Sequence, residues 1–319
     1  MPDFSDLDEY HLTILLEYCV LEHWNEVADL EYLTSLKLHK IMFETAERQD
    51  LPITRSWYLL GKYINQPEIV RREFALDFFY DPESQGIDIF SLIDDFYELY
   101  VFLKGDVSEF MDRSKIIVTN GWDYLRKIYK EQAPEPYSSC YQASIEYRKF
   151  LYDFRNYSNL KDCDVLLKNC SILTTNLHRS IKKVEEFDPF FEILIKFTDI
   201  VEDALQKTAL NVRSGKSNDD HIQFLLAQDS IYFNFVWKQF AKKIAINTVT
   251  GPREGEIKQS FSDDLNDLTH QTYYIINENI EKARYLKLFL NKTDFVKTQK
   301  NQKETIEKII EAENILQRG

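Results

Sequence analysis

Hydrophobic residues recur at helical spacing along almost the whole chain. In the stretch 36–50, the face that an amphipathic helix buries holds Leu38, Met42, Thr45 and Ala46. The apolar residues Leu36, Ile41 and Phe43 alternate with polar and charged ones, Lys37, His39, Lys40, Glu44 and Glu47. The same spacing predicts a first helix capped by Ser5 or Asp6 and ending near Ala28. The other predicted helices are 31–50, 54–65, 67–81, 88–103, 107–119, 120–130, 139–157, 160–187, 189–213, 219–247, 261–290 and 294–317.

The segment after residue 50 predicts a rigid turn followed by a second helix. Pro52 ends the preceding helix because it disfavours the helical conformation of Leu51. Beyond it, Trp57, Leu60 and Ile64 fall at i, i+3 and i+7. We therefore expect a helix-turn-helix over 36–64, with Trp57 buried against the first of its two helices.

The same stretch resembles the start of a known domain family. Its first part has Lys37, Leu38, Lys40, Ile41, Met42 and Phe43, and its second has Leu51, Pro52, Ile53, Thr54, Tyr58, Lys62 and Tyr63. This order is similar to the beginning of the Panacea domain of SocA-like antitoxins. The usual Gly-Pro after Lys-Tyr is replaced here by 64–67, Ile-Asn-Gln-Pro, and no resemblance extends beyond about residue 80. The resemblance implies an antitoxin-like protein that binds another protein.

The chain predicts two all-α domains. Pro134 and Pro136 break any helix and favour an extended linker over 131–136. We expect a small helical, or winged-helix-like, N-terminal domain over 1–133 and a helical bundle over 137–319, because long helices with short loops pack in this way. The low content of Gly and Pro, 8 residues of each, favours long helices over a sandwich or a doubly wound sheet.

Charge is distributed unevenly between the two parts. The net charge is −14, of which residues 1–130 carry −12, from 25 acidic and 13 basic residues. Binding to a phosphate backbone requires clustered Lys and Arg. The acidic first part therefore argues against nucleic acid as a partner of the 36–64 segment.

The four cysteines lack the spacing of a zinc or redox motif. Cys163 and Cys170 are seven residues apart on a predicted helix, about 10 Å by the helix rise, which is too far for a disulfide. We expect all four cysteines, Cys19 and Cys140 included, to be buried free thiols in a reducing cytoplasm. The first ten residues lack the charged and apolar regions of a signal peptide, and no apolar run reaches the length of a membrane span.

Candidate metal ligands occur on one predicted helix. Asp263, Asp267 and His270 fall at i, i+4 and i+7, and such side chains can bind a divalent metal. The alternative is that Ser262 caps the helix and the acids of its first turn interact with the helix dipole. We prefer the second interpretation and assign no catalytic, cofactor-binding or metal-binding residue.

Other charged clusters are compatible with solvated helix faces. Two are acidic: Asp199, Glu202 and Asp203 form one, and Asp94, Asp95 and Glu98 the other. The residues 213–217 lack the earlier glycine of a phosphate-binding loop, and Arg213 and His221 are too far apart for the pair of a HEPN ribonuclease. Residues 282–303 hold seven bases and one acid, which suits an acidic partner or the acidic N-terminal part.

These features favour a non-enzymatic, cytoplasmic protein that binds another protein or itself. Two alternatives stay open: a helix-turn-helix regulator that binds nucleic acid through 36–64, and a metal-dependent bundle enzyme at Asp263, Asp267 and His270. No cofactor and no membrane partner are expected.

Overall fold

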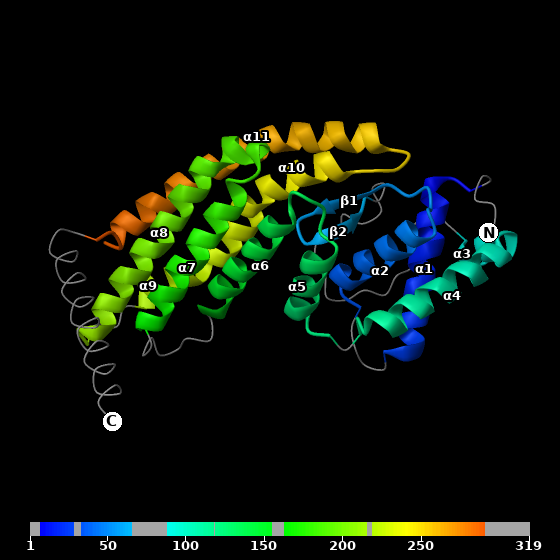
Figure 1. The fold of residues 1–319 in the computed structure, drawn as a ribbon, viewed down its shortest axis with the longest axis horizontal. Helices are drawn as coiled ribbons and strands as arrows, with labels where there is room; N and C mark the ends of the chain where they lie inside the picture. The colour runs from blue at the N-terminus through cyan, green and yellow to red at the C-terminus, as the bar shows by residue number, and fades with distance from the viewer. Residues whose placement is uncertain are drawn as a thin grey trace, which may run out of the picture. The chain divides into compact units, whose positions relative to one another are not determined.

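The computed structural model describes residues 7–28, 33–65, 88–117, 119–154, 163–215 and 219–290 (Figure 1). The fold is all-α, as the sequence predicts, and the only sheet among these residues is a two-stranded hairpin. The helices are α1 (Glu9–Val27), α2 (Ser35–Arg48), α3 (Ile89–Asp95), α4 (Tyr97–Ser114), α5 (Gly121–Glu131), α6 (Ser138–Asp153), α7 (Cys163–Ile181), α8 (Asp188–Arg213), α9 (Asp219–Ile231), α10 (Lys238–Thr248) and α11 (Glu254–Tyr285), and the strands are β1 (Arg55–Tyr58) and β2 (Gly61–Ile64).

The chain folds into two compact units. Unit 1 contains residues 1–141 and 240–266, and unit 2 contains 142–239 and 267–319. This division differs from a single boundary at the 131–136 linker, because the chain returns from unit 2 to complete unit 1. Three helices, α6, α10 and α11, contribute residues to both units.

The predicted helix over 54–65 is wrong, because this segment forms the hairpin. β1 and β2 are antiparallel, and Tyr58 pairs with Gly61 at the turn. Gly61 has a φ of +86°, which only glycine adopts readily. Aromatic and β-branched residues such as Trp57, Tyr63 and Ile64 favour strands, whereas the helical spacing rested on three positions in a short window. The turn glycine and these propensities together favour the hairpin.

Residues 248–253 cover the edge of β1. The Arg55 and Thr250 backbones exchange two N–H···O hydrogen bonds of 2.9 Å, and the Trp57 N–H donates to Thr248 Oγ1 over 3.0 Å. Trp57 is buried, as predicted, and its ring centroid lies 5.6 Å from that of Tyr141. These contacts explain why residues 240–266 belong to unit 1.

Helix boundaries in the middle of unit 1 also differ from the prediction. Lys104, Gly105 and Asp106 do not end a helix, since α4 continues through them to Ser114. Asp106 accepts hydrogen bonds from Arg48 Nη2 and Gln49 Nε2, which hold α4 against the end of α2. The helix predicted over 107–119 ends at Ser114 instead, and residues 116 and 117 form a turn.

Caps decide several helix ends. Asn120, where the predicted helix begins, caps α5 by accepting from the Trp122 N–H over 2.9 Å. Asp8 caps α1, so this helix begins after the predicted caps, which lie outside the described residues. α11 begins at Glu254, so Ser262 is not a cap: its hydroxyl donates to the Lys258 carbonyl within the helix.

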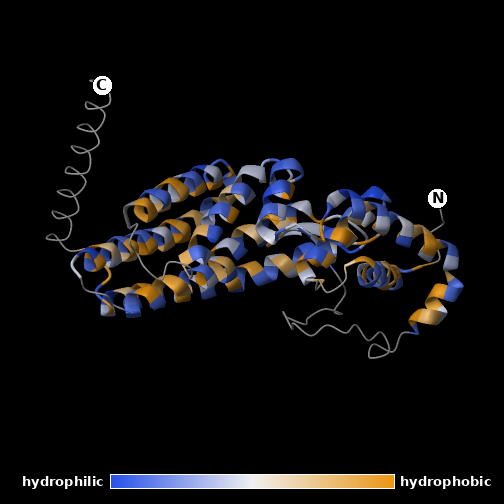
Figure 2. Ribbon diagram, turned by 90° about the horizontal axis from the view of Figure 1, so that it is seen from below, coloured by the Kyte–Doolittle hydropathy of each residue, from blue (hydrophilic) through white to orange (hydrophobic). Residues whose placement is uncertain are grey.

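Unit 2 is built mainly from α6, α7, α8, α9 and α11, which Figure 1 shows as long helices packed side by side. Figure 2 shows hydrophobic and hydrophilic residues alternating along them, as in amphipathic helices. α9 and α10 are joined by a π-helical segment, Tyr232–Trp237. The helices predicted over 67–81 and 294–317 lie outside the described residues.

Gly251 should be far more sensitive to substitution than Gly215. Both have positive φ values, +119° and +70°, but a Cβ at Gly251 would lie 2.6 Å from Thr54 Cα, whereas nothing lies within 4 Å of one at Gly215. We expect Gly215→Ala to cost about 1–2 kcal/mol, the penalty for left-handed backbone, and Gly251→Ala to cost about 3 kcal/mol or more. Urea unfolding of the full chain measures both. Equal losses would contradict the close packing of residues 250–253 on the hairpin.

Candidate functional site

The helix α2 is buried along its centre, although it carries charged residues. Every residue from Leu38 to Ala46 is buried. The Lys40 Nζ donates hydrogen bonds to the carbonyl oxygens of Leu60 and Lys62, over 2.5 and 2.6 Å. These carbonyls flank Gly61, so the ammonium group of Lys40 holds the hairpin turn against α2.

A second lysine, on the hairpin, pairs with carboxylates of α2. The Lys62 Nζ, on β2, lies 2.9 Å from Glu44 Oε1 and 2.9 Å from Glu47 Oε2. It also lies 4.9 Å from the centre of the Phe43 ring, within the range of a cation–π interaction. Each buried charge therefore has a partner, as burial of an ammonium group requires.

These buried groups do not form an accessible reactive site. Burial, with the nearby charge of Lys62, holds the pKa of Lys40 well below its usual range, as in lysines that act as nucleophiles. However, Lys40 is only 1% exposed and donates to two carbonyls. No substrate can reach it in this conformation.

The predicted helix-turn-helix is not formed, and α2 cannot serve as a recognition helix. Helices that read DNA expose side chains to the major groove, whereas nine consecutive residues of α2 are buried. The hairpin that replaces the second helix also buries Trp57, Lys62 and Ile64. The nucleic-acid hypothesis for 36–64 therefore loses its structural basis.

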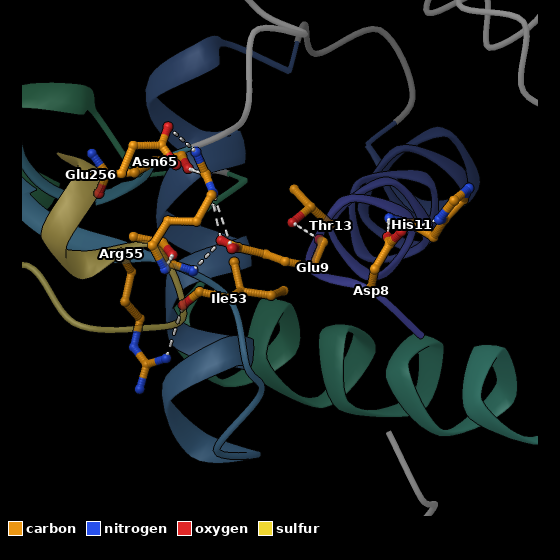
Figure 3. Close-up of polar contacts among 10 residues, drawn as sticks. Asp8, Glu9, His11, Thr13, Ile53, Arg55, Asn65 and Glu256 are labelled. Atoms are coloured by element: carbon orange, nitrogen blue, oxygen red, sulfur yellow. Dashed lines mark hydrogen bonds and ion pairs between the residues drawn. The ribbon is translucent and has the colours of Figure 1, made fainter. Parts of the chain in front are cut away.

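A partly buried charge pair joins three parts of unit 1. Glu9 Oε2, on α1, lies 3.0 Å from the Arg253 Nε, and its other oxygen accepts from the Thr54 N–H over 2.6 Å (Figure 3). Arg253 also donates to the Asn65 carbonyl oxygen, and its own N–H donates to Thr54 Oγ1 over 3.0 Å. All of these contacts are internal, so the cluster ties the start of α11 to the hairpin and α1.

The candidate metal ligands on α11 are not brought together with others. Asp263, Asp267 and His270 are all exposed, and Asp263 Oδ1 accepts from Gln259 Nε2 within the helix. Among the described residues, no group of three or more His, Cys, Asp and Glu side chains is arranged to hold a metal ion.

The acidic face at Asp199, Glu202 and Asp203 is partly internal rather than fully solvated. Burial is the main reason that the pKa values of Glu202 and Asp203 are raised above their usual range. Burial also raises the pKa of Tyr147 well above its usual range. The Thr174 hydroxyl lies near both Glu202 and Tyr147, but Thr174 Oγ1 and Tyr147 Oη have no partner in hydrogen-bonding geometry within the described part. Sequence spacing alone does not reveal this polar cluster, because its members come from α6, α7 and α8.

The second acidic cluster lies on the surface together with exposed apolar side chains. Asp94, Asp95 and Glu98 are exposed. Phe90, Tyr97 and Val101 are 67%, 60% and 49% exposed, which is high for such residues. We define these six residues of α3 and α4 as the acidic apolar surface. The sequence prediction identified its acids but not its apolar residues, which fit the helical pattern of a buried face.

Contacts with α1 fix the helix that carries most of this surface. The Tyr100 hydroxyl donates to Glu22, and the Lys104 Nζ lies 3.1 Å from Glu22 and 2.8 Å from Glu26. Cys19 on α1 lies against the Tyr100 carbonyl. These contacts hold α4 in place, so Tyr97 and Val101 are presented from a rigid element; Tyr97 lies next to the contacts with α1, its ring centroid 6.3 Å from that of Tyr100.

The remaining candidates have structural partners or lie outside the described part. Arg213 ends α8, Ser214 and Gly215 form a turn, and Lys216 and Ser217 lie outside. His221 Nε2 lies 3.1 Å from the Leu286 carbonyl oxygen, so this imidazole joins α9 to the end of α11. Of the basic stretch 282–303, only residues 282–290 are described. Cys19, Cys140 and Cys170 are buried free thiols.

Comparison with known proteins gives a family but no activity. Residues 80–315 match the model of a family described as "Domain of unknown function (DUF8098)". No curated protein and no solved structure matches the chain. Within the described residues, no helix is both long enough and apolar enough to cross a bilayer.

Replacement of His39 should reduce the sensitivity of the protein to acid. Burial lowers the pKa of His39 to about 3, below its usual value of about 6.5, and its ring lies 4.4 Å from that of Tyr63 with no hydrogen-bond partner at Nδ1 in the described part. As the pH falls, the unfolded chain therefore binds a proton at His39 before the native state does. The stabilisation of the native state that depends on neutral His39 is fully present above pH 6.5 and is lost as the pH falls towards 3. His39→Phe should lessen the loss by about 1.4 kcal/mol per pH unit.

Urea unfolding between pH 7 and pH 5 measures the effect. His270→Phe, which removes an exposed imidazole, is the control and should leave the pH dependence unchanged. Parallel curves for His39→Phe and the wild type would contradict the buried, neutral state of His39.

Glu202→Gln should stabilise the protein at neutral pH. Because burial raises the pKa of Glu202 above its usual value of about 4.5, the native state binds this proton more tightly than the unfolded chain does. The resulting stabilisation is present at low pH and is lost as the pH rises from about 4.5 through the native pKa. Thermal unfolding at pH 5 and pH 7.5 should show a smaller decrease for Glu202→Gln than for the wild type. Glu278→Gln, on an exposed position of α11, should behave as the wild type does.

Proposed function

Since the chain belongs to the family described as a domain of unknown function, DUF8098, whose description gives no activity, we propose a function from the geometry. The protein binds another protein, without catalysing a reaction, through the acidic apolar surface of α3 and α4. This surface lies within the family match, so the proposal concerns the part of the chain that defines the family.

The observation that carries the proposal is the exposure of Phe90, Tyr97 and Val101. Tyr97 and Val101 are four residues apart on α4, so they project from the same side of the helix. Aromatic side chains with most of their area in water gain free energy when a partner covers them, and they are enriched at interfaces. Because Tyr100 and Lys104 hold α4 against α1, α4 needs no rearrangement to present them.

The charges around these residues indicate the chemistry of the partner. Residues 88–117 contain seven acidic and three basic residues, and Asp94, Asp95 and Glu98 are exposed beside the apolar positions. A complementary partner offers apolar side chains surrounded by Lys or Arg, as a basic amphipathic helix does. The acids would speed association and select against acidic partners.

Two further features are consistent with a protein-binding role in the cytoplasm. Burial raises the pKa of the Cys170 thiol to about 12, and the free thiols of Cys19, Cys140 and Cys170 are buried. Such thiols are typical of proteins in reducing compartments. The resemblance of 36–64 to the Panacea domain implies the same class of function, an antitoxin-like protein that binds another protein.

A basic amphipathic peptide tests the surface directly. The probe is a fluorescein-labelled helix of about 18 residues, five turns, with Leu on one face and Lys and Arg on the other. Tyr97→Glu/Val101→Glu should weaken its binding at least tenfold, because the variant removes both apolar contacts. Fluorescence anisotropy measures the Kd.

The matched control is Tyr274→Glu, which changes a comparably exposed residue of α11 in unit 2. It should bind the peptide as the wild type does. Equal binding by Tyr97→Glu/Val101→Glu and the wild type would refute the assignment of the surface, and no binding to the wild type would refute the partner chemistry.

A further inference from the structure

A second exposed helix face, on α7 in unit 2, has the opposite chemistry. Between residues 165 and 184 the sequence contains four basic residues and no acid. The basic residues Lys168, Arg179, Lys182 and Lys183 are all exposed.

Apolar residues lie on the same side of α7. Val165 and Ile172 are 57% and 48% exposed, and they are seven residues apart, two helical turns. Lys168 and Arg179 follow them at three and seven residues, so all four share one face. Since the opposite side of α7 packs in unit 2 through Leu166, Cys170 and Leu177, this face is free to meet a partner. We call it the basic apolar face.

We propose that the partner is a second copy of this chain: the acidic apolar surface of one copy docks on the basic apolar face of another. This inference rests on the proposed function and names its partner. The two surfaces match in kind, since each is presented by helices and combines exposed apolar side chains with charges of one sign.

Complementary charge favours this pairing over two others. Two acidic apolar surfaces, or two basic apolar faces, would place like charges opposite each other, which is destabilising. Contact between unlike surfaces is head to tail. In a pair formed this way, each copy keeps one of its two surfaces unpaired, so the pair can bind further copies. The association should therefore grow with protein concentration and weaken as salt screens the charges.

Sedimentation velocity on the full chain tests the inference. At about 0.05 M salt the average mass should rise above the 38.0 kDa of one chain as the concentration increases, and at about 0.5 M salt it should approach that value. Asp95→Lys/Glu98→Lys should be monomeric, because both of its docking surfaces are basic. Lys168→Glu/Arg179→Glu should be monomeric for the opposite reason.

Mixing the two variants is the decisive experiment. Each retains one wild-type surface, the basic face in the first and the acidic surface in the second, so an equimolar mixture should contain associated species that neither variant forms alone. Circular dichroism should show that both are folded, since all four positions are exposed. A mixture that stays monomeric, or a variant that still self-associates alone, would overturn the inference.

Two outcomes separate this inference from the proposed function. A wild-type protein that is monomeric at all concentrations but binds the basic peptide would overturn self-association and leave the acidic apolar surface as a binding site for another protein. Binding of duplex DNA that Lys168→Glu/Arg179→Glu abolishes, without self-association, would assign the basic apolar face to nucleic acid and would also overturn the inference.

Discussion

Because the centre of α2 is buried, its charged residues must be paired with oxygen or nitrogen atoms inside unit 1. Moving an ammonium group from water into the interior costs several kcal/mol unless nearby oxygens compensate it. Carbonyls of the hairpin turn supply those oxygens for Lys40, and Glu44 supplies them for Lys62. Such close approach needs a glycine at 61, since a Cβ there would lie 3.0 Å from the Tyr129 ring. The hairpin and α2 thus depend on each other.

The hairpin in turn determines which other segments complete unit 1. Once β1 lies against α2, its free edge needs hydrogen-bond partners, and the Thr250 backbone and the Thr248 hydroxyl provide them. The Glu9–Arg253 pair then joins α1 to the same point. Unit 1 is therefore assembled from two stretches far apart in the sequence, 1–141 and 240–266.

The exposed helix faces, rather than the interior, carry the proposed binding function. The charges at the centre of unit 1 bind each other, and the polar cluster around Glu202 mainly affects stability. By contrast, Tyr97 and Val101 on α4, and Val165 and Ile172 on α7, remain in water beside charges of opposite sign. A helical protein with two such faces has the features of an assembly component, in which rigid helices present binding residues.

The sequence by itself determined the all-α fold, several helix ends and the burial of Trp57. These features depend on interactions within a few residues, such as the Asn120 cap, or on hydrophobicity alone. Only the tertiary structure decided that 55–64 is a hairpin and that 240–266 completes unit 1. The physical reason is that both depend on partners distant in sequence: α2 binds the hairpin turn through Lys40, and Thr250 pairs with the hairpin edge. A periodic pattern cannot reveal contacts that only folding creates.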